Sequence, residues 1–220
     1  MNPGATLAKM EQHNFYRILR DKRRLPRRRH TETNIGIIQD DIQETFNTWP
    51  TPERVWLAMK HRDLTRKTRD FLWKSVQGAY KIGPYWSHIA GYEDRVVCPN
   101  CDEMEDLDHI LLWCRARVCK QAWNLADRVW AKRTTTAIPK TMGTILGCTL
   151  ATFNTNGKKD KGKGRLFQIL ISETAYLIWR LQNERRIQQG DRPLNYPLSK
   201  ATWSEDRMGV VGVLGELVVR

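Results

Sequence analysis

Three cysteines and one histidine lie close together near the middle of the chain, and their spacing constrains the fold more than any other feature. Two residues separate Cys98 from Cys101, seven separate Cys101 from His109, and four separate His109 from Cys114. Zn2+ prefers four tetrahedral sulfur and nitrogen ligands. The spacing therefore predicts one structural zinc ion held by these four side chains. Four protein ligands leave no position for water or substrate, so we expect the metal to stabilise the fold and not to catalyse a reaction.

The two ligand pairs need different local structures. Pro99 and Asn100 favour a turn that aims both thiolates of the first pair at the same point. His109 and Cys114 are separated by about 140° around an ideal α-helix, so the helix must deform or end between them. Two alternatives stay open. In the first, the cysteines are buried free thiols beside a surface histidine. In the second, the first pair is a redox motif, although no strand-helix-strand pattern surrounds it.

The cysteine content and the charge indicate an intracellular protein that attracts polyanions. Five cysteines are an odd number, which does not suit a disulfide framework, and Cys119 and Cys148 are expected to be free thiols. The N-terminus does not resemble a secretory signal, and no apolar run reaches the roughly 18 residues of a membrane helix. We therefore expect a nuclear or cytoplasmic location and no membrane partner. The 37 Lys and Arg residues outnumber the 24 acidic residues, and the net charge of +13 favours a polyanion such as nucleic acid.

Apolar residues at helical spacing predict a mainly α fold. Thr51 can cap a helix whose first residue is Pro52, and further helices are predicted for 35–46, 65–80, about 107–130 and 165–189. An N-terminal helix is expected to run into a basic tract, where Pro26 breaks it. No convincing run of alternating strands is present. The expected architecture is a helical domain with a small embedded Cys-Cys-His-Cys zinc site, followed by a long C-terminal helix.

Composition divides the chain into five expected segments. Residues 1–50 form a basic N-terminal helical segment, and residues 51–153 form the helical zinc-binding domain. Residues 154–164 have almost no apolar content and several glycines, which predicts a flexible basic loop. Residues 165–189 form the long helix packing on the domain, and residues 190–220 form an irregular tail.

A basic tract near the N-terminus is the candidate nucleic-acid contact. It consists of Lys22, Arg23, Arg24, Arg27, Arg28 and Arg29. These side chains can neutralise phosphates, which would make binding strongly dependent on salt. A nuclear-import signal or a solubilising segment is an equally weighted alternative.

Two other groups of residues have both a functional and a structural interpretation. The acidic residues between the ligand pairs resemble a magnesium-binding nuclease cluster, but we expect them to be the solvated first turn of the helix that carries His109. They are Asp102, Glu103, Glu105, Asp106 and Asp108. A set of aromatic residues can stack on unpaired bases, but large rings at this spacing belong more often to a core. This set is Trp73, Tyr80, Tyr85, Trp86 and Tyr92.

The chain resembles a known family over much of its length. The resemblance rests on the segments RDFLWKSVQGAYKIGPYWSHIAGYEDRVVCPNCDEMEDLDHILLWC, LGCTLA and RLFQILISETAYLIWRLQNERRI and on Trp123. They are similar to the C-terminal region of fungal retrotransposon polyproteins of the non-long-terminal-repeat type. There, a reverse-transcriptase zinc-binding domain follows reverse transcriptase and ribonuclease H modules. The likeness covers about 10–203, is strongest over 69–123, and implies the same four zinc ligands.

The resemblance and the charge together set the expected function. We expect a non-catalytic, zinc-stabilised accessory module that binds RNA or DNA and accompanies reverse transcriptase or ribonuclease H modules. The paired-aspartate motif of reverse transcriptase and the four spaced carboxylates of ribonuclease H are not assignable in this chain. The alternatives are a protein docking module without nucleic-acid affinity, a degenerate retroelement fragment without activity, and a nuclease that uses Asp106 and Asp108.

Overall fold

The computed structural model describes residues 11–22 and 28–188 and is almost entirely helical. The expected mainly α fold with a long C-terminal helix is confirmed. The α-helices are α1 (Gln12–Lys22), α2 (Arg29–Phe46), α3 (Pro52–Ala58), α4 (Arg66–Val76), α5 (Arg117–Ala131), α6 (Met142–Leu146) and α7 (Lys161–Gln188). Short 3-10 turns are η2 (Gly83–His88), η3 (Glu93–Arg95) and η5 (Cys148–Leu150), η4 (His109–Trp113) is a π turn, and β1 (Asn154–Thr155) pairs with β2 (Lys158–Lys159).

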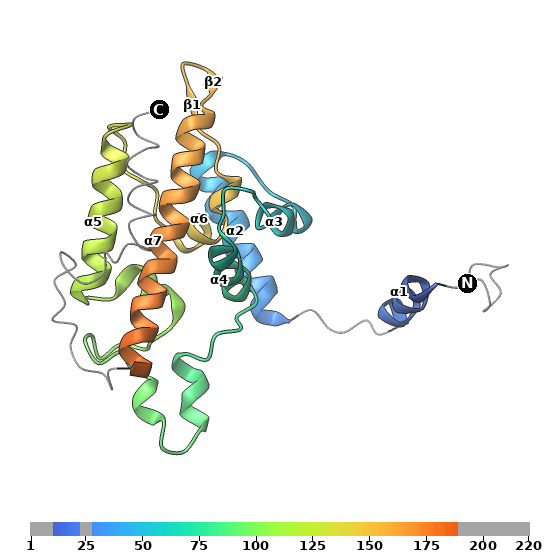
Figure 1. Ribbon diagram of the computed structural model, residues 1–220, viewed down its shortest axis with the longest axis vertical. Coiled ribbons are helices and arrows are strands. Elements are labelled where there is room, and N and C mark those ends of the chain that lie inside the picture. Colours follow the sequence, from blue (N-terminus) through green and yellow to red (C-terminus); the bar gives the residue numbers. More distant parts are fainter. Residues whose placement is uncertain (1–10, 23–27, 189–220) are drawn as a thin grey trace.

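Helix α7 lies in the middle of the body and contacts several other elements (Figure 1). It packs along α5 on one side and meets α4, α6, η4 and η5 on others. Its buried side chains include Phe167, Leu170, Ile171 and Ile178. The long helix predicted for 165–189 is therefore present, and it begins four residues earlier. Gly190, its expected stop, lies outside the described residues.

Helix α2 belongs to the same core, which differs from the expected separate segment 1–50. Ile38 and Ile42 are fully buried in the cluster that also holds residues of α5 and α7. α2 crosses α6 so closely that a Cβ on Gly143 would lie 2.4 Å from the Ile37 carbonyl oxygen. The Gly143 backbone N–H donates to the Asp41 carboxylate at 2.6 Å. Only glycine fits this crossing, which joins α2 to the rest of the domain.

The segment predicted as a flexible basic loop, 154–164, has regular structure. Asn156 and Gly157 both have positive φ, at 52° and 75°, and connect two-residue strands in antiparallel register. Asn-Gly favours such a turn because both residues tolerate this backbone conformation. Asp160 then accepts a hydrogen bond from the Lys163 backbone N–H at 2.8 Å, which caps the start of α7. The low apolar content of this segment therefore did not indicate a flexible loop, because the segment also contains an Asn-Gly turn and a helix cap.

Two threonines cap helices. Thr51 accepts from the Arg54 backbone N–H at 3.3 Å, as predicted, and Pro52 is the first residue of α3. Thr65 accepts from the Thr68 backbone N–H at 3.2 Å at the start of α4. In contrast, the single helix expected over about 107–130 is interrupted after the π turn, and α5 starts only at Arg117.

A finger formed by η2 and η3 projects from the body below α7 (Figure 1). The rings of Trp86 and Tyr92 stack with centroids 5.4 Å apart, and the Arg95 guanidinium lies 5.1 Å from the Trp86 centroid. Tyr80 instead packs on Trp179 of α7 with centroids 4.0 Å apart, as a core ring would. Within the described chain, no helix combines the length and the apolar character needed to cross a membrane.

Candidate metal centre

The first two candidate ligands lie on a tight loop before the π turn. The Cys98 backbone N–H donates to the Glu103 carbonyl at 2.8 Å, which closes the loop. The Cys101 and Asp102 N–H groups both donate to the Cys98 carbonyl, at 3.1 and 2.9 Å. Asp102 adopts a left-handed φ of 56°, which a short polar side chain tolerates. This geometry turns both thiols to one side, as the two-residue spacing predicts.

The second pair meets because the helix deforms. The Cys114 backbone N–H donates to the His109 carbonyl at 2.7 Å, a hydrogen bond between residues five apart. Such a π turn brings positions five apart to the same side of the helix. Asp106 caps the turn by accepting from the His109 backbone N–H at 2.7 Å. The sequence expectation that the helix must deform or end between His109 and Cys114 is therefore confirmed on both counts.

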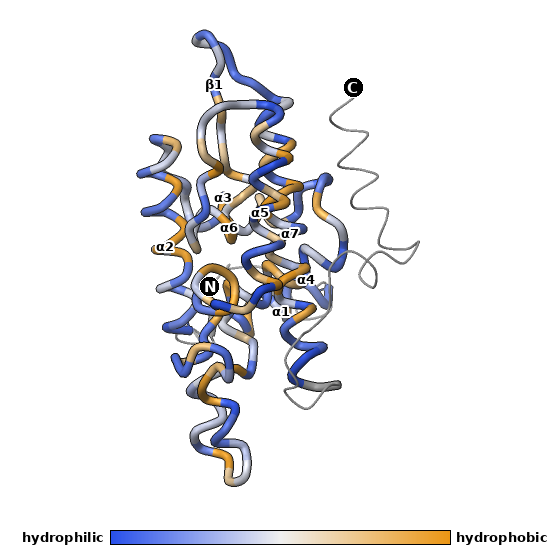
Figure 2. Tube along the Cα trace, turned by 90° about the vertical axis from the view of Figure 1, so that its left-hand side faces the viewer, coloured by the Kyte–Doolittle hydropathy of each residue, from blue (hydrophilic) through white to orange (hydrophobic). Residues whose placement is uncertain are grey.

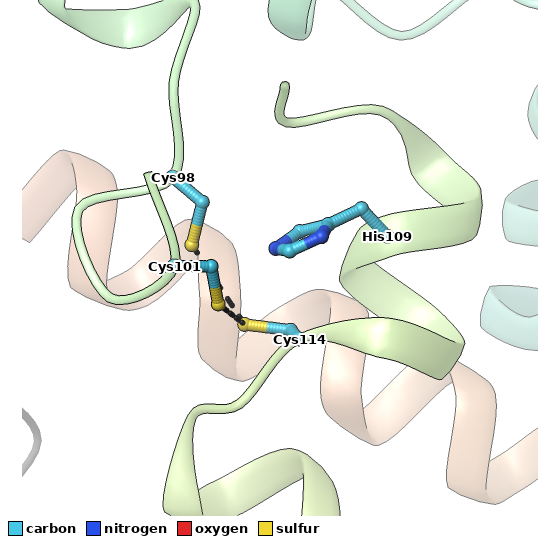
Figure 3. Close-up of side chains that lie close together, drawn as sticks. All are labelled: Cys98, Cys101, His109 and Cys114. Atoms are coloured by element: carbon cyan, nitrogen blue, oxygen red, sulfur yellow. Dashed lines mark hydrogen bonds between the residues drawn. The ribbon is translucent and has the colours of Figure 1, made fainter. Parts of the chain in front are cut away.

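The four side chains converge on one point from these two elements (Figure 3). Their ligand atoms all lie within 4.8 Å of one another. Cys114 Sγ is 3.8 Å from Cys98 Sγ and 3.9 Å from Cys101 Sγ. Two sulfurs of a tetrahedral site with Zn–S bonds of about 2.3 Å are separated by about 3.8 Å. The cluster can therefore hold a metal ion with little rearrangement.

His109 is oriented as a ligand by a neighbouring carboxylate. Its ring is buried, Nδ1 lies 3.2 Å from Glu103 Oε2, and Nε2 has no hydrogen-bond partner. A buried nitrogen without a partner is costly unless it binds something. With the Nδ1 proton facing the carboxylate, the Nε2 lone pair is the free acceptor, which is the usual arrangement of a metal-bound histidine. The donor set and this orphaned atom fit a metal ion.

The three candidate cysteine ligands have different electrostatic surroundings. Burial would raise the pKa of Cys98, but hydrogen bonds, chiefly one from the Asn100 backbone, lower it to about 7. The Arg115 backbone N–H donates to Cys101 Sγ at 3.2 Å. Burial raises the pKa of Cys114. A bound cation would stabilise all three thiolates, because metal ligation requires deprotonated sulfur.

The two remaining cysteines have a different environment. Burial raises the pKa of Cys119 to about 11 and that of Cys148 to about 12, and neither takes part in a disulfide. Both thiols are therefore protonated at neutral pH, and Cys119 Sγ donates to the Leu111 carbonyl at 3.5 Å. Thiols of this kind are inert core residues.

The loop that carries the first two ligands is tied to α7 by a buried carboxylate. Glu105 is only 4% exposed and accepts hydrogen bonds from Gln182 and Arg186. Arg186 also donates to the Val97 carbonyl at 2.8 Å, and the Arg185 guanidinium lies 3.7 Å from Glu105. The expectation that the acidic residues here are all solvated is therefore wrong for Glu105. No local pattern could reveal it, because its partners are about eighty positions away.

Other acidic residues of this segment are engaged in local structure. Asp106 caps the π turn, and Asp108 accepts from the Trp113 indole N–H at 2.7 Å. Of the groups of His, Cys, Asp and Glu within residues 11–22 and 28–188, the Cys98–Cys114 cluster is the one gathered closely enough to hold a metal ion.

The basic tract is only partly within the described residues. Arg28 and Arg29 are exposed where α2 begins, and Lys22 is the last residue of α1. Arg23, Arg24 and Arg27 lie outside the described residues. The structure thus leaves this candidate interface as a prediction.

No family model, curated protein or solved structure matches this chain.

Proposed function

We propose that this chain is a non-catalytic module that is stabilised by one zinc ion and binds RNA or DNA. The observation that carries the proposal is the preassembled Cys98, Cys101, His109 and Cys114 cluster, with its unpartnered histidine nitrogen. Three sulfurs and one imidazole are the ligands of structural zinc sites, and a buried four-ligand site has no open position for chemistry. Zinc is therefore the metal we propose, in a structural role.

A basic helix next to the cluster supports nucleic-acid binding. Helix α5 begins three residues after Cys114 and exposes Arg117, Lys120 and Arg128. Its one acidic residue, Asp127, is paired with Lys140 at 2.6 Å, so it does not offset these charges. With a net charge of +13 for the whole chain, this surface would attract phosphates.

The hairpin at the upper end of the molecule adds to this surface. Lys158 and Lys159 are exposed on β2, and Figure 2 shows a continuous hydrophilic segment there. We propose that these cations, the α5 cations and the basic tract act together on one strand of nucleic acid. A nuclear or cytoplasmic location suits such a partner.

The resemblance to retrotransposon polyproteins gives the proposed context. We infer a retroelement-derived module that acts beside reverse transcriptase or ribonuclease H modules. It would hold template or product strands and leave the chemistry to those modules. A copy that has lost its activity would keep the fold and the zinc site but not the affinity.

Zinc content and zinc-dependent folding test the proposal. Protein purified under reducing conditions should contain one zinc per chain by elemental analysis. Cys98→Ser should lose the zinc and much of its thermal stability, since structural zinc contributes on the order of 10 kcal/mol in small domains. Cys119→Ser is the matched control, because this buried thiol lies outside the cluster and should leave the zinc in place. A wild-type chain that folds fully without zinc would refute the proposal.

Docking onto a protein is a second candidate function, favoured by α1. Phe15, Ile18 and Leu19 lie on one side of this helix and are 40%, 38% and 58% exposed. Figure 1 draws α1 apart from the body. An apolar helix face of this kind suits a groove on a partner. Binding through it would change little with salt, whereas phosphate binding would weaken steeply, so titrations at two salt concentrations distinguish the two functions.

A further inference from the structure

A cavity of about 200 Å³ lies between the metal centre, the start of α5 and the end of α7. Its lining includes Asn100 and Arg117, which are exposed, and Cys114, Val118 and Arg185, which are buried. The cavity therefore runs from the surface to the interior. It is smaller than the roughly 300–1,000 Å³ of pockets for drug-sized ligands, so it suits one chemical group of a larger molecule.

The inner wall holds a buried cation with unused donors. Arg185 is 2% exposed, and its Nε and Nη2 atoms have no hydrogen-bond partner. The nearby carboxylate of Glu105 lies 3.7 Å from Nη2, too far for a hydrogen bond, and already accepts from Gln182 and Arg186. The Glu105 ion pair partly offsets the Arg185 charge, but two guanidinium donors stay without a hydrogen bond, which is unfavourable in a buried site unless an acceptor meets them.

The outer wall is the first turn of a helix that lacks a cap. Ala116 precedes the fifteen-residue α5, and no side chain caps its first turn. Residues 116–119 all line the cavity, and the first turn contains Arg117 but no acidic residue. The Cys119 N–H donates to the Ala116 carbonyl at 3.1 Å. The N–H groups of the first two helical residues, Arg117 and Val118, and the positive end of the helix dipole attract an anion there.

We propose that this cavity binds a phosphate group, held by Arg185 from within, Arg117 at the mouth and the backbone N–H groups at the start of α5. A guanidinium fork matches phosphate oxygens, and helix N-termini are common phosphate sites. The exposed cations of α5 continue from the mouth, which fits a phosphate carried on a nucleic-acid strand. The assignment to a nucleic-acid phosphate rests on the proposed function, whereas the phosphate site itself does not.

Inorganic phosphate is the first probe, with thermal unfolding of the zinc-loaded full chain as the readout. At constant ionic strength, replacing chloride by phosphate should raise the melting temperature of the wild type. Arg117→Gln should lose most of that increment, and Arg128→Gln, an exposed arginine about three turns along the same helix, should keep it. Phosphate also stabilises proteins non-specifically, but that effect is common to both variants and cancels in the comparison. Equal increments in the two variants would overturn the site.

A second variant supplies the site with a carboxylate from the protein itself. Ala116→Asp places a carboxylate at the cap position of α5, where it can meet the same donors. We expect this variant to melt at a higher temperature than the wild type without phosphate and to gain nothing from phosphate. A phosphate increment that survives in Ala116→Asp would contradict the site, and so would a lower melting temperature in phosphate-free buffer.

Oligonucleotides then identify the source of the phosphate. Single-stranded RNA of one sequence, with a 5′-phosphate or a 5′-hydroxyl, is titrated by fluorescence anisotropy against the wild type and both arginine variants. A preference for the 5′-phosphate that disappears in Arg117→Gln assigns a terminal phosphate. Equal affinities that weaken more in Arg117→Gln than in Arg128→Gln, an α5 cation outside the cavity, assign a backbone phosphate. Phosphate-specific stabilisation without oligonucleotide binding keeps the site and refutes the proposed function.

Discussion

At the scale of single residues, Glu103 lies beside the histidine of the candidate metal centre. Its carboxylate lies 3.2 Å from His109 Nδ1 and the same distance from the exposed Arg115 guanidinium. A carboxylate in this position fixes the ring orientation and the tautomer that leaves Nε2 free for the metal. The ligand spacing in the sequence identifies His109, but it does not show that Glu103 is the acidic residue beside it.

Glu103→Ala is expected to weaken zinc binding by about 10–100-fold without removing a ligand. Competition with a chromophoric zinc chelator measures the affinity. Asp94→Asn serves as the control, since this carboxylate is exposed on η3, away from the cluster, and should leave the affinity unchanged. An unaltered affinity in Glu103→Ala would show that the imidazole is held without the carboxylate.

At the scale of elements, Asp160 joins the hairpin to α7. It accepts from the Lys163 backbone N–H, and it also contacts Thr155 and the Arg133 guanidinium, the latter at 3.2 Å. Asp160→Ala should lower the free energy of unfolding by about 1 kcal/mol, the typical effect of losing a helix cap. Urea denaturation measures the change. Asp160→Asn can still accept the capping hydrogen bond, and a loss as large as that of the alanine variant would argue against the cap.

The lowered pKa of Asp160 makes the stability of the protein depend on pH. The hydrogen bond from the Lys163 backbone N–H, with smaller contributions from Thr155 and Arg133, outweighs burial and lowers the pKa of Asp160. A folded pKa below the unfolded value of about 3.9 stabilises the fold above that pH. The contribution is lost as the pH falls through the folded pKa. The difference in unfolding free energy between the wild type and Asp160→Asn should therefore shrink on acidification.

Glu105 links the loop that carries Cys98 and Cys101 to the end of α7. Removing one partner of a buried ion pair costs roughly 3–5 kcal/mol, because the other charge stays buried without compensation. Glu105→Gln, which keeps the shape of the side chain, should destabilise the protein by that order in urea denaturation. Asp70→Asn removes an exposed partner of Lys74 and should cost less than about 1 kcal/mol. Equal effects of the two substitutions would mean that the Glu105 contacts carry no special weight.

The sequence predicts those features whose interacting residues are close together along the chain. Thr51 and Thr65 cap their own helices, and the ligand spacing forces a deformation between His109 and Cys114, so these features are readable locally. The apolar spacing on both sides of residues 114–116 suits one continuous helix, so it does not indicate that α5 starts only at Arg117. No local pattern indicates that Glu105 is buried, because its partners, Gln182 and Arg186, are far away in the chain.

At the scale of the whole molecule, the division into segments could not be read from composition. Composition separates a basic N-terminal part and a polar loop, yet Ile38, Trp130 and Phe167 belong to one continuous core. The rings of Phe46, Phe153 and Phe167 meet at centroid distances of 5.2–5.8 Å, which joins α2, the segment before the hairpin and α7. Such contacts depend on the tertiary arrangement, which no window of sequence contains.

The distribution of charge over the whole molecule gives the final prediction. If the basic tract contacts phosphates, each contact contributes about 0.7 to the slope of log affinity against log salt for single strands. Replacing all six residues of the tract by glutamine should therefore reduce that slope by about 4, as measured by anisotropy over a salt series. A charge-matched control replaces six exposed cations elsewhere: Arg54, Lys60, Arg62, Arg66, Lys67 and Lys132. Both variants carry the same net charge, so long-range attraction alone would change their slopes equally, and such a result would remove the tract from the proposed interface.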